Sequence, residues 1–264
     1  MSAIVFLGGG RITSALLAGL RLAKYRQPII VHDHDPRKLR DLQRAYGVDV
    51  EPDLHRAVDQ AKLLIIAVRP DSVGELLRHV GFVEWPLGAV SLAAGVPLSR
   101  LRAGLRPPVR WARAMPSPAC RSGRGLTGVT FDRNFPSRCQ REVCEFFSEV
   151  GPVLEIPESK FDAFTVTYSC SRGYHALATM AAAAQELGLD RKTALTAAAH
   201  ALADGIVAWR EGDTSLDALI EEAATPGGIA AAVMDAMDRA GYARVIKKGL
   251  EAGRRRARRN AKMA

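Results

Sequence analysis

The sequence predicts an α/β fold in which a Rossmann-like, doubly wound parallel sheet is followed by an all-α domain. Short apolar runs alternate with amphipathic helical patterns in the first part of the chain, which is typical of βα units around a parallel sheet. The first of these runs leads into three consecutive glycines. From about residue 158 the pattern is helical throughout and rich in alanine. The predicted domains are therefore residues 1–157 and residues 158–264.

A glycine turn joins the first predicted strand, 3–7, to the first predicted helix, 10–24. In such a turn the first glycine permits a tight bend, and a second lets backbone N–H groups approach a pyrophosphate at the helix N-terminus. We assign these roles to Gly8 and Gly10. The third small residue of the G-x-G-x-x-G pattern is replaced by Thr13, so a purely structural turn is the alternative. The predicted dinucleotide site at this turn consists of Gly8, Gly10, Arg11 and Ile12.

The second predicted strand, 28–32, is followed by Asp33, His34, Arg37 and Lys38. A carboxylate at this place accepts hydrogen bonds from the adenosine ribose, whereas cations favour a 2′-phosphate. Asp33 therefore favours NADH, and on this ground we expect NADH to bind at least as well as NADPH. His34 and the two cations favour NADPH instead, so the choice between NADH and NADPH stays open. Alternatively, Asp33 only caps the helix that follows.

The next strand, 62–68, contains a continuous apolar run from Leu63 to Val68, as expected for a parallel strand that is buried on both faces. Ligands of open parallel sheets bind at the carboxyl ends of the strands. We therefore add the residues at this strand end to the cofactor site: Ala67, Val68, Arg69 and Pro70. The other predicted elements are helices 36–46, 53–60 and 71–80, and strands 87–91, 109–114, 127–131 and 152–156.

The composition excludes several classes of protein. The chain is 48% apolar but has no apolar run long enough to cross a membrane. Because glycines interrupt its apolar start, we interpret that start as a strand and not as a signal peptide, and we expect a cytoplasmic protein. The four cysteines have no C-x-x-C spacing and no histidine partner at ligand spacing. We therefore expect reduced thiols and no metal site.

The formal net charge of +9 comes largely from a basic segment at 254–262. We interpret this segment as the solvated, fraying end of a last helix, where cations suit the negative end of the helix dipole. No aromatic residues alternate with the arginines, so this segment has no aromatic side chain on which a nucleic-acid base could stack. A nucleic-acid partner is therefore not expected.

A second glycine-containing motif follows in the helical part, at Thr225, Pro226, Gly227 and Gly228. Thr225 and Pro226 are typical of an N-cap and a first helical residue. The two glycines then fall inside the predicted helix, where each costs about 1 kcal/mol relative to alanine. We infer that a small carboxylate approaches the backbone N–H groups at this point. A simple loop that ends before the helix is the alternative.

Five segments in order resemble the pyrroline-5-carboxylate reductase family over essentially the full length of the chain. They are Gly8–Gly10, Ala67–Pro70, Ser91–Val96, Arg113–Pro116 and Thr225–Gly228. The resemblance implies a Rossmann domain, a helical domain that dimerises, and reduction of 1-pyrroline-5-carboxylate to proline with NADPH or NADH. It also implies that Ala94 contacts the cofactor. The substrate contacts that it implies are Met115, Pro116, Gly227, Gly228, Ile229 and Ala230.

The sequence departs from the family at the implied substrate contacts. Ile229 and Ala230 stand where the family has two threonines, so the hydroxyl expected at the ring nitrogen is absent. Three other side chains in the flanking segments are the candidate catalytic donors in its place: Thr225, Ser117 and His175. Tyr174 lies in the same segments, but we assign it to packing in the dimer interface. Arg11 replaces an asparagine of the glycine loop, and its guanidinium either pairs with a phosphate or blocks the cofactor site.

Two functions follow from these observations. The first is an NAD(P)H-dependent imine reductase that acts on pyrroline-5-carboxylate or a related cyclic imino acid. The alternative is a catalytically impaired descendant that serves as a nucleotide-binding scaffold or regulatory module. The expected partners are the cyclic imino acid and a second copy of the chain, because the alanine-rich helices carry more apolar surface than a small domain buries.

Overall fold

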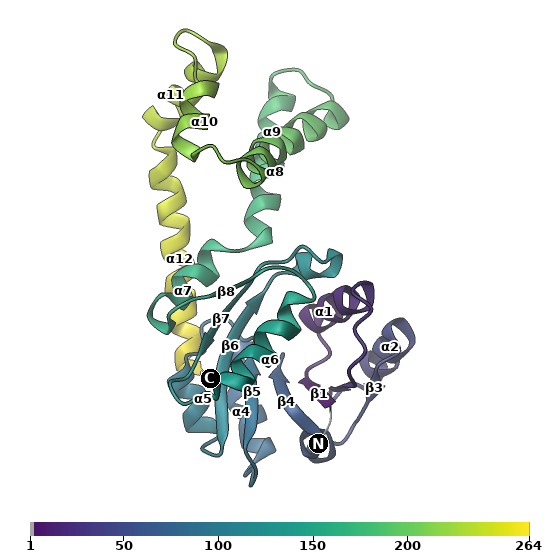
Figure 1. Cartoon of the computed structure of the whole chain (residues 1–264). Coiled ribbons are helices and arrows are strands. Elements are labelled where there is room, and N and C mark those ends of the chain that lie inside the picture. Colours follow the sequence, from purple (N-terminus) through teal and green to yellow (C-terminus); the bar gives the residue numbers. More distant parts are fainter. Residues whose placement is uncertain (1–2, 264) are drawn as a thin grey trace. The chain divides into compact units, whose positions relative to one another are not determined.

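The computed structural model describes residues 3–263 and divides them into two compact units (Figure 1). The first unit contains the chain up to Tyr168 together with the segment from Ala252 onward, and the second is Ser169–Glu251. The first holds a parallel-sheet α/β fold and the second is all helical, which confirms the predicted fold class. The division between the two units does not fall at residue 157, because helix α7 (Glu158–Thr167) belongs to the same unit as the sheet. The domain boundary at 157 stays a prediction.

The first unit is built on one eight-stranded sheet with the order β3-β2-β1-β4-β5-β6-β7-β8. Neighbouring strands are parallel except β6 and β7, which pair antiparallel. Strand order reverses beside β1, which lies between β2 and β4, and this is the place where ligands bind in doubly wound sheets. The strands are β1 (Ala3–Leu7), β2 (Ile29–His32), β3 (Asp49–Val50), β4 (Ala61–Ile66), β5 (Leu87–Ser91), β6 (Val109–Pro116), β7 (Thr127–Phe131) and β8 (Val153–Glu155).

Strand β1 is buried along its whole length and β4 is buried from Leu63 to Ile66, which explains their apolar runs. Along β1, Ile4 and Phe6 join one hydrophobic cluster, and Val5 and Leu7 join the other. Residues of α1, α2 and α6 complete the first cluster, and residues of α3, α4 and α5 complete the second. The helices of this unit are α1 (Arg11–Leu22), α2 (Pro36–Tyr46), α3 (Leu54–Asp59), α4 (Val73–Val80), α5 (Leu98–Gly104), α6 (Ser137–Ser148) and α7.

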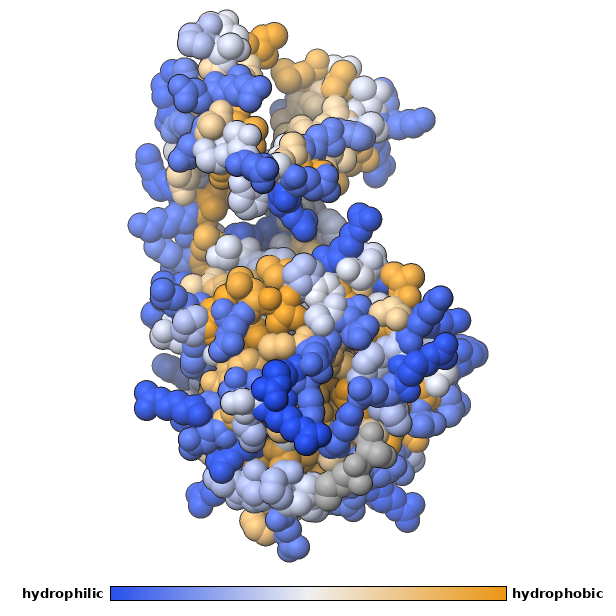
Figure 2. Space-filling view, in the orientation of Figure 1, coloured by the Kyte–Doolittle hydropathy of each residue, from blue (hydrophilic) through white to orange (hydrophobic). Residues whose placement is uncertain are grey.

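The helical unit has a small core and a large exposed apolar surface. Its buried cluster is formed by Ala181, Ala194 and Ala198. Large apolar side chains are exposed on α9, α11 and α12, among them Ile206, Val207, Trp209, Val233 and Val245. Figure 2 shows hydrophobic residues, in orange, at the surface of the molecule. A single copy leaves this surface in water, so a second copy is the simplest way to bury it. The helices are α8 (Cys170–Glu186), α9 (Arg191–Glu211), α10 (Leu216–Ala223), α11 (Ile229–Arg239) and the first part of α12 (Tyr242–Met263).

The motif around Gly227 is a turn and not the first turn of a helix. Helix α11 begins at Ile229 with Gly228 as its N-cap, so the prediction that Thr225 is the N-cap and Pro226 the first helical residue is wrong. Gly227 has a φ of +77°, which side chains with a Cβ rarely adopt. A Cβ on Gly228 would lie 2.9 Å from the carbonyl oxygen of Thr225. The turn itself therefore requires both glycines.

The basic C-terminal segment is an ordered helix. Helix α12 runs to Met263, and the part from Ala252 onward groups with the sheet unit. Ala257 and Asn260 are buried, whereas the cations between them are exposed. The expectation of a fraying end is thus wrong, because two residues on one face of the helix dock on the sheet unit. Within residues 3–263, no helix is long and apolar enough to cross a membrane.

Candidate cofactor and substrate site

The glycine turn after β1 has the geometry of a phosphate-binding loop. Gly8 has a φ of +112°, and a Cβ there would lie 2.7 Å from the carbonyl oxygen of Ala67. Gly10 has nothing within 4 Å of its Cβ position, so its backbone faces open space. The contact with Ala67 thus requires a glycine at residue 8, and Gly10 leaves room for a ligand.

Thr13 explains the imperfect third position of the glycine pattern. Its side chain is fully buried, and its hydroxyl donates a hydrogen bond to the carbonyl oxygen of Gly8 at 2.6 Å. The threonine therefore ties the first turn of α1 to the glycine loop. A small residue at this place would permit close packing but would not make this hydrogen bond.

The N-terminus of α1 leaves backbone donors available. Gly10 is the N-cap, and no side chain caps the helix. The N–H of Ser14 makes the first hydrogen bond of the helix, to the carbonyl oxygen of Gly10 at 3.0 Å. The N–H groups of Arg11 and Ile12 precede it, at the positive end of the helix dipole. These groups fit a pyrophosphate, which binds where backbone N–H donors and a positive potential are accessible. Gly10 has no Cβ that would obstruct its approach.

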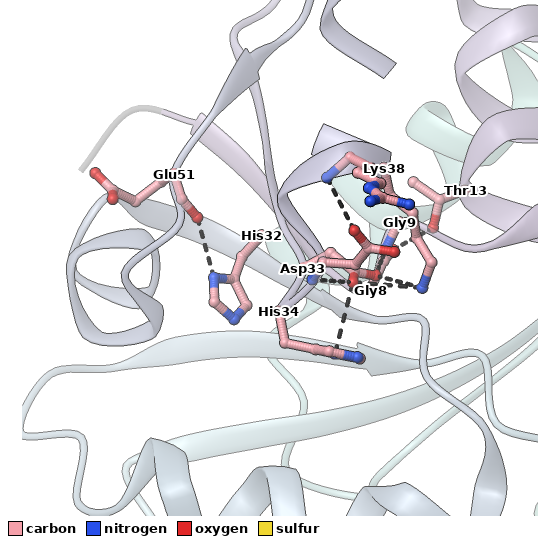
Figure 3. Close-up of polar contacts among 10 residues, drawn as sticks. Gly8, Gly9, Thr13, His32, Asp33, His34, Lys38 and Glu51 are labelled. Atoms are coloured by element: carbon pink, nitrogen blue, oxygen red, sulfur yellow. Dashed lines mark hydrogen bonds and ion pairs between the residues drawn. The ribbon is translucent and has the colours of Figure 1, made fainter. Parts of the chain in front are cut away.

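Asp33 braces the glycine loop (Figure 3). Its carboxylate is buried and accepts hydrogen bonds from the N–H groups of Gly9 at 2.8 Å and Asp35 at 2.9 Å. The ammonium group of Lys38 lies 3.4 Å from both carboxylate oxygens. Burial by itself raises the pKa of Asp33, but the two N–H groups and Lys38 outweigh it and hold the pKa below its ordinary value. Asp33 is therefore ionised near neutral pH and already has partners within the chain.

Three basic residues lie near Asp33 on the solvent side of the cavity. His34 has a side chain that is 92% exposed, with Nδ1 at 3.5 Å from Asp33 Oδ1. Lys38 is partly exposed, and Arg11 lies exposed at the start of α1. Lys38 and Arg11 thus place positive charge at the mouth of the cavity, near the buried negative charge of Asp33, and this suits both a ribose hydroxyl and a phosphate.

A cavity of about 830 Å³ lies at the carboxyl ends of β1, β2 and β4. It brings together most of the predicted cofactor residues: Gly8, Gly10, Arg11, Asp33, His34, Ala67, Val68 and Arg69. Three others do not line it. Ile12 packs against the hydrophobic core, Pro70 begins a short 3₁₀ turn, and Ala94 lies in the loop after β5.

One wall of the cavity was not predicted from the sequence. Ser72, Glu75, Leu76 and His79 line it from α4 and the residue before it. Glu75, Leu76 and His79 follow Ser72 by three, four and seven residues, and this spacing places side chains on one face of a helix. That periodicity, directly after the strand end at Ala67, is the signal that would have indicated this wall.

The predicted substrate residues of the sheet unit lie at the end of β6. Met115 is half-buried and Pro116 is buried, and both pair with β7. Ser117 is also buried, and its hydroxyl accepts a hydrogen bond from the N–H of Ala119 at 3.1 Å. Ser117 thus caps the short turn Pro118–Ser122, a structural role that the sequence analysis did not assign to it.

Arg113, two residues earlier on β6, is a buried cation with anionic partners on α7. Its Nη1 lies 3.0 Å from both carboxylate oxygens of Glu158, and its Nη2 lies 2.7 Å from Asp162 Oδ1. The guanidinium carbon lies 4.5 Å from the centre of the Phe161 ring. This cluster fixes the end of β6 to α7, and with it the backbone that leads into Met115.

The remaining predicted site residues belong to the helical unit. His175 is exposed on α8, and its carbonyl oxygen accepts a hydrogen bond from the Thr179 hydroxyl at 2.9 Å. Thr225 and Ala230 are exposed, and Ile229 is 87% exposed. The first intrahelical hydrogen bond of α11 is donated by Ala232 to Gly228 at 3.2 Å, so earlier N–H groups remain as donors for an anion. The assignments of His175, Thr225 and Ser117 as proton donors stay predictions.

Comparison with known proteins identifies the family. Residues 158–260 match the domain described as pyrroline-5-carboxylate reductase dimerisation. A pyrroline-5-carboxylate reductase from Methanosarcina acetivorans is 32% identical over 202 residues, which is 75% of each chain. The chain belongs to the pyrroline-5-carboxylate reductase family. The dimerisation match agrees with the exposed apolar surface of the helical unit and supports a homo-oligomer.

The N-terminal match and the solved structures agree with this assignment. Residues 3–86 match the family described as NADP oxidoreductase, coenzyme F420-dependent. The fold is similar to a pyrroline-5-carboxylate reductase from Coxiella burnetii, with a TM-score of 0.88 at 22% identity and 98% of each chain covered. It is also similar to a Plasmodium falciparum pyrroline carboxylate reductase with NADP bound, with a TM-score of 0.85 at 18% identity and 98% of each chain covered. This family member is an NAD(P)H-dependent oxidoreductase, as the resemblance of its motifs implied.

Proposed function

We propose that this chain reduces the imine of 1-pyrroline-5-carboxylate, or of a closely related cyclic imino acid, with NADPH or NADH. The observation that carries the proposal is the glycine turn at Gly8 and Gly10, which opens into the cavity at the carboxyl ends of β1 and β4. The relatives that the chain matches are named for this reaction. The cofactor supplies the hydride that is added to the imine carbon, and the imine nitrogen must carry a proton.

The sheet unit binds the dinucleotide through backbone and charged groups. The N–H groups of Arg11 and Ile12 hold the pyrophosphate at the start of α1. Asp33 keeps the glycine loop in place through Gly9 and accepts from the ribose, and Lys38 neutralises its charge. The loop from Ala67 to Arg69 forms the side of the cavity next to Gly8, so it limits the depth to which the dinucleotide enters.

The helical unit binds the carboxylate of the imino acid. Gly227 and Gly228 form the turn that precedes α11, and this turn leaves the first N–H groups of the helix accessible. A small carboxylate accepts hydrogen bonds from these groups. Ile229 and Ala230 offer no hydroxyl to the ring nitrogen, so Thr225 is the nearest hydroxyl along the chain. Loss of a single neutral donor costs about 1–3 kcal/mol, which slows a reduction without abolishing it.

The test is oxidation of NADPH and NADH by the purified protein with a panel of cyclic imines. The panel contains pyrroline-5-carboxylate, the corresponding six-membered imino acid, and a pyrroline without a carboxylate. We expect turnover with the carboxylates and none with the unsubstituted pyrroline. Absence of turnover with every imine, in a protein that still binds the dinucleotide, would favour the scaffold alternative.

A gain-of-function variant tests the substrate contact more sharply than a loss. A Gly228→Val variant is uninformative, because its Cβ collides with Thr225 and breaks the turn whether or not a ligand binds there. Ile229→Thr adds a hydroxyl at a strongly exposed position without a steric conflict. We expect it to raise kcat with pyrroline-5-carboxylate, whereas Ile229→Val, which keeps the shape without the hydroxyl, leaves kcat unchanged.

A further inference from the structure

Asn260 is a buried polar residue in a helical segment whose other polar residues are exposed. Its side chain is 9% exposed, and Nδ2 donates a hydrogen bond to the carbonyl oxygen of Ala94 at 3.0 Å. Burial of an amide is costly unless its polar atoms are paired. The amide therefore replaces water as the partner of the Ala94 carbonyl.

One turn earlier, α12 makes a backbone-to-backbone approach to the same loop. Gly95 has a φ of +80°, and a Cβ there would lie 2.7 Å from the carbonyl oxygen of Ala257. Gly253, one turn further back, lies close to α7, with its Cβ position 3.0 Å from Val166 Cγ1. The end of α12 is thus seated against the sheet unit by a row of small residues, with Asn260 as its polar contact.

The loop that Asn260 holds lies beside the cofactor cavity. The loop starts after β5, where the N–H of Leu92 donates to the carbonyl oxygen of Ile66 at 2.9 Å. The residues that follow Ile66 on the neighbouring strand line the cavity, from Ala67 to Arg69. Doubly wound sheets bind a dinucleotide across the point where strand order reverses, one nucleotide on each side. Asp33 and Lys38 are on the β2 side, so the loop after β5 is on the side of the nicotinamide.

We propose that Asn260 is a positioning residue for the nicotinamide half of the cofactor, acting through the carbonyl of Ala94 on the loop after β5. The inference rests on the proposed cofactor site and adds to it a residue from the far end of the sequence. Without the Asn260 hydrogen bond, the Ala94 carbonyl turns toward another donor and the loop backbone moves. The adenosine half of the site, which is built on β2 and α2, is unaffected.

The test compares two ligands in variants of the full-length protein. NADPH contains both halves of the dinucleotide, and 2′-phospho-ADP-ribose lacks only the nicotinamide ring. Asn260→Ala removes the donor, and Asn260→Asp keeps the shape but places an acceptor against the carbonyl. We expect either change to raise the Kd of NADPH about fivefold to tenfold, the effect of leaving one buried carbonyl unpaired. The Kd of 2′-phospho-ADP-ribose, measured by titration calorimetry, should stay within twofold.

The control variant is Arg259→Ala, which removes an exposed side chain from the adjacent position of the same helix. It should change neither Kd. An Asn260 variant that raises the Kd of both ligands equally has a merely structural effect and overturns the proposal. A variant that raises neither Kd overturns it as well. If the unmodified protein binds neither ligand, the proposed cofactor site itself is wrong, a result distinct from failure of this inference.

Discussion

Arg113 and Glu158 join β6 to α7 through one guanidinium nitrogen that lies 3.0 Å from both carboxylate oxygens. The two partners differ in environment. The arginine side chain is 2% exposed, whereas that of the glutamate is 34% exposed. Glu158 also accepts a hydrogen bond from the N–H of Leu98, at the start of α5. One carboxylate therefore holds three elements that meet beside the loops after β5 and β6.

The asymmetry predicts an unequal cost of removing each partner. Glu158→Ala leaves a buried guanidinium with Asp162 as its remaining anion, and we expect a loss of about 3 kcal/mol in the free energy of unfolding. Arg113→Met should cost less, because water can hydrate the two partly exposed carboxylates and the new side chain is apolar. Urea denaturation measures both. Glu142→Ala, which breaks the exposed pair with Arg138, is the control and should cost at most about 0.5 kcal/mol.

Two glycines of the first turn should fail in different ways when changed to alanine. Gly8→Ala places a Cβ 2.7 Å from the Ala67 carbonyl at a φ of +112° and should destabilise the free protein by about 1–3 kcal/mol. Gly10→Ala meets no atom within 4 Å and should leave the melting temperature of the free protein unchanged. Its methyl group should nevertheless weaken NADPH binding at least tenfold, because it occupies the approach to the helix N-terminus. Equal melting temperatures of the two variants would contradict this account.

Removing the charge of Asp33 should change cofactor preference. Asp33→Asn retains an oxygen that accepts from Gly9 but loses the negative charge, so the ratio of NADPH affinity to NADH affinity should rise several-fold. Asp33→Ala should weaken both cofactors, and NADH more than NADPH, because the loop brace and the ribose acceptor are lost together. Asp41→Asn on α2, an exposed residue paired with Arg44, is the control. An unmodified protein that binds NADPH more than tenfold tighter than NADH would overturn the assignment of Asp33 as a ribose acceptor that favours NADH.

Tyr25 should ionise at a higher pH in the folded protein than in the unfolded chain. Burial of its ring, with a smaller effect of the Glu149 carboxylate, raises the pKa of Tyr25 to about 12. Between the unfolded pKa of about 10 and this value, the unfolded chain releases the proton and the folded chain keeps it. Stability should therefore fall as pH rises through this window, and it should do so less in Tyr25→Phe. Spectrophotometric titration of both proteins checks the assignment, since the difference curve should have its midpoint near 12 and not near 10.

The oligomer should depend on the exposed apolar surface of the helical unit. We expect light scattering at micromolar concentration to give at least a dimer. Trp209→Glu, which charges an exposed aromatic position on α9, should shift the protein toward monomer. The matched change of an exposed polar residue on that helix, Lys192→Glu, should not. A monomer in the unmodified protein would be contrary to the dimerisation match.

Strands β1 and β4 were predictable because each carries an apolar run, which is typical of parallel strands that are buried on both faces. Strand β3 was not, since Asp49 and Val50 are too few to show a period. The turn at Gly227 was misread because a good N-cap and a proline are equally compatible with a turn. The contacts of Thr13 and Asn260 were hidden, because their partners, the carbonyls of Gly8 and Ala94, leave no trace in the sequence.

The docking of Ala257 and Asn260 on the sheet unit has a consequence for how the protein is made. Domains generally fold as units while the chain is still being synthesised, the N-terminal one first. Here the sheet unit is interrupted by Ser169–Glu251, so its last segment emerges only after the whole helical unit. The hydrogen bond between Asn260 and the carbonyl of Ala94 can therefore form only after the C-terminal segment has left the ribosome. A chain truncated before residue 260 would contain every strand of the sheet but would lack this contact.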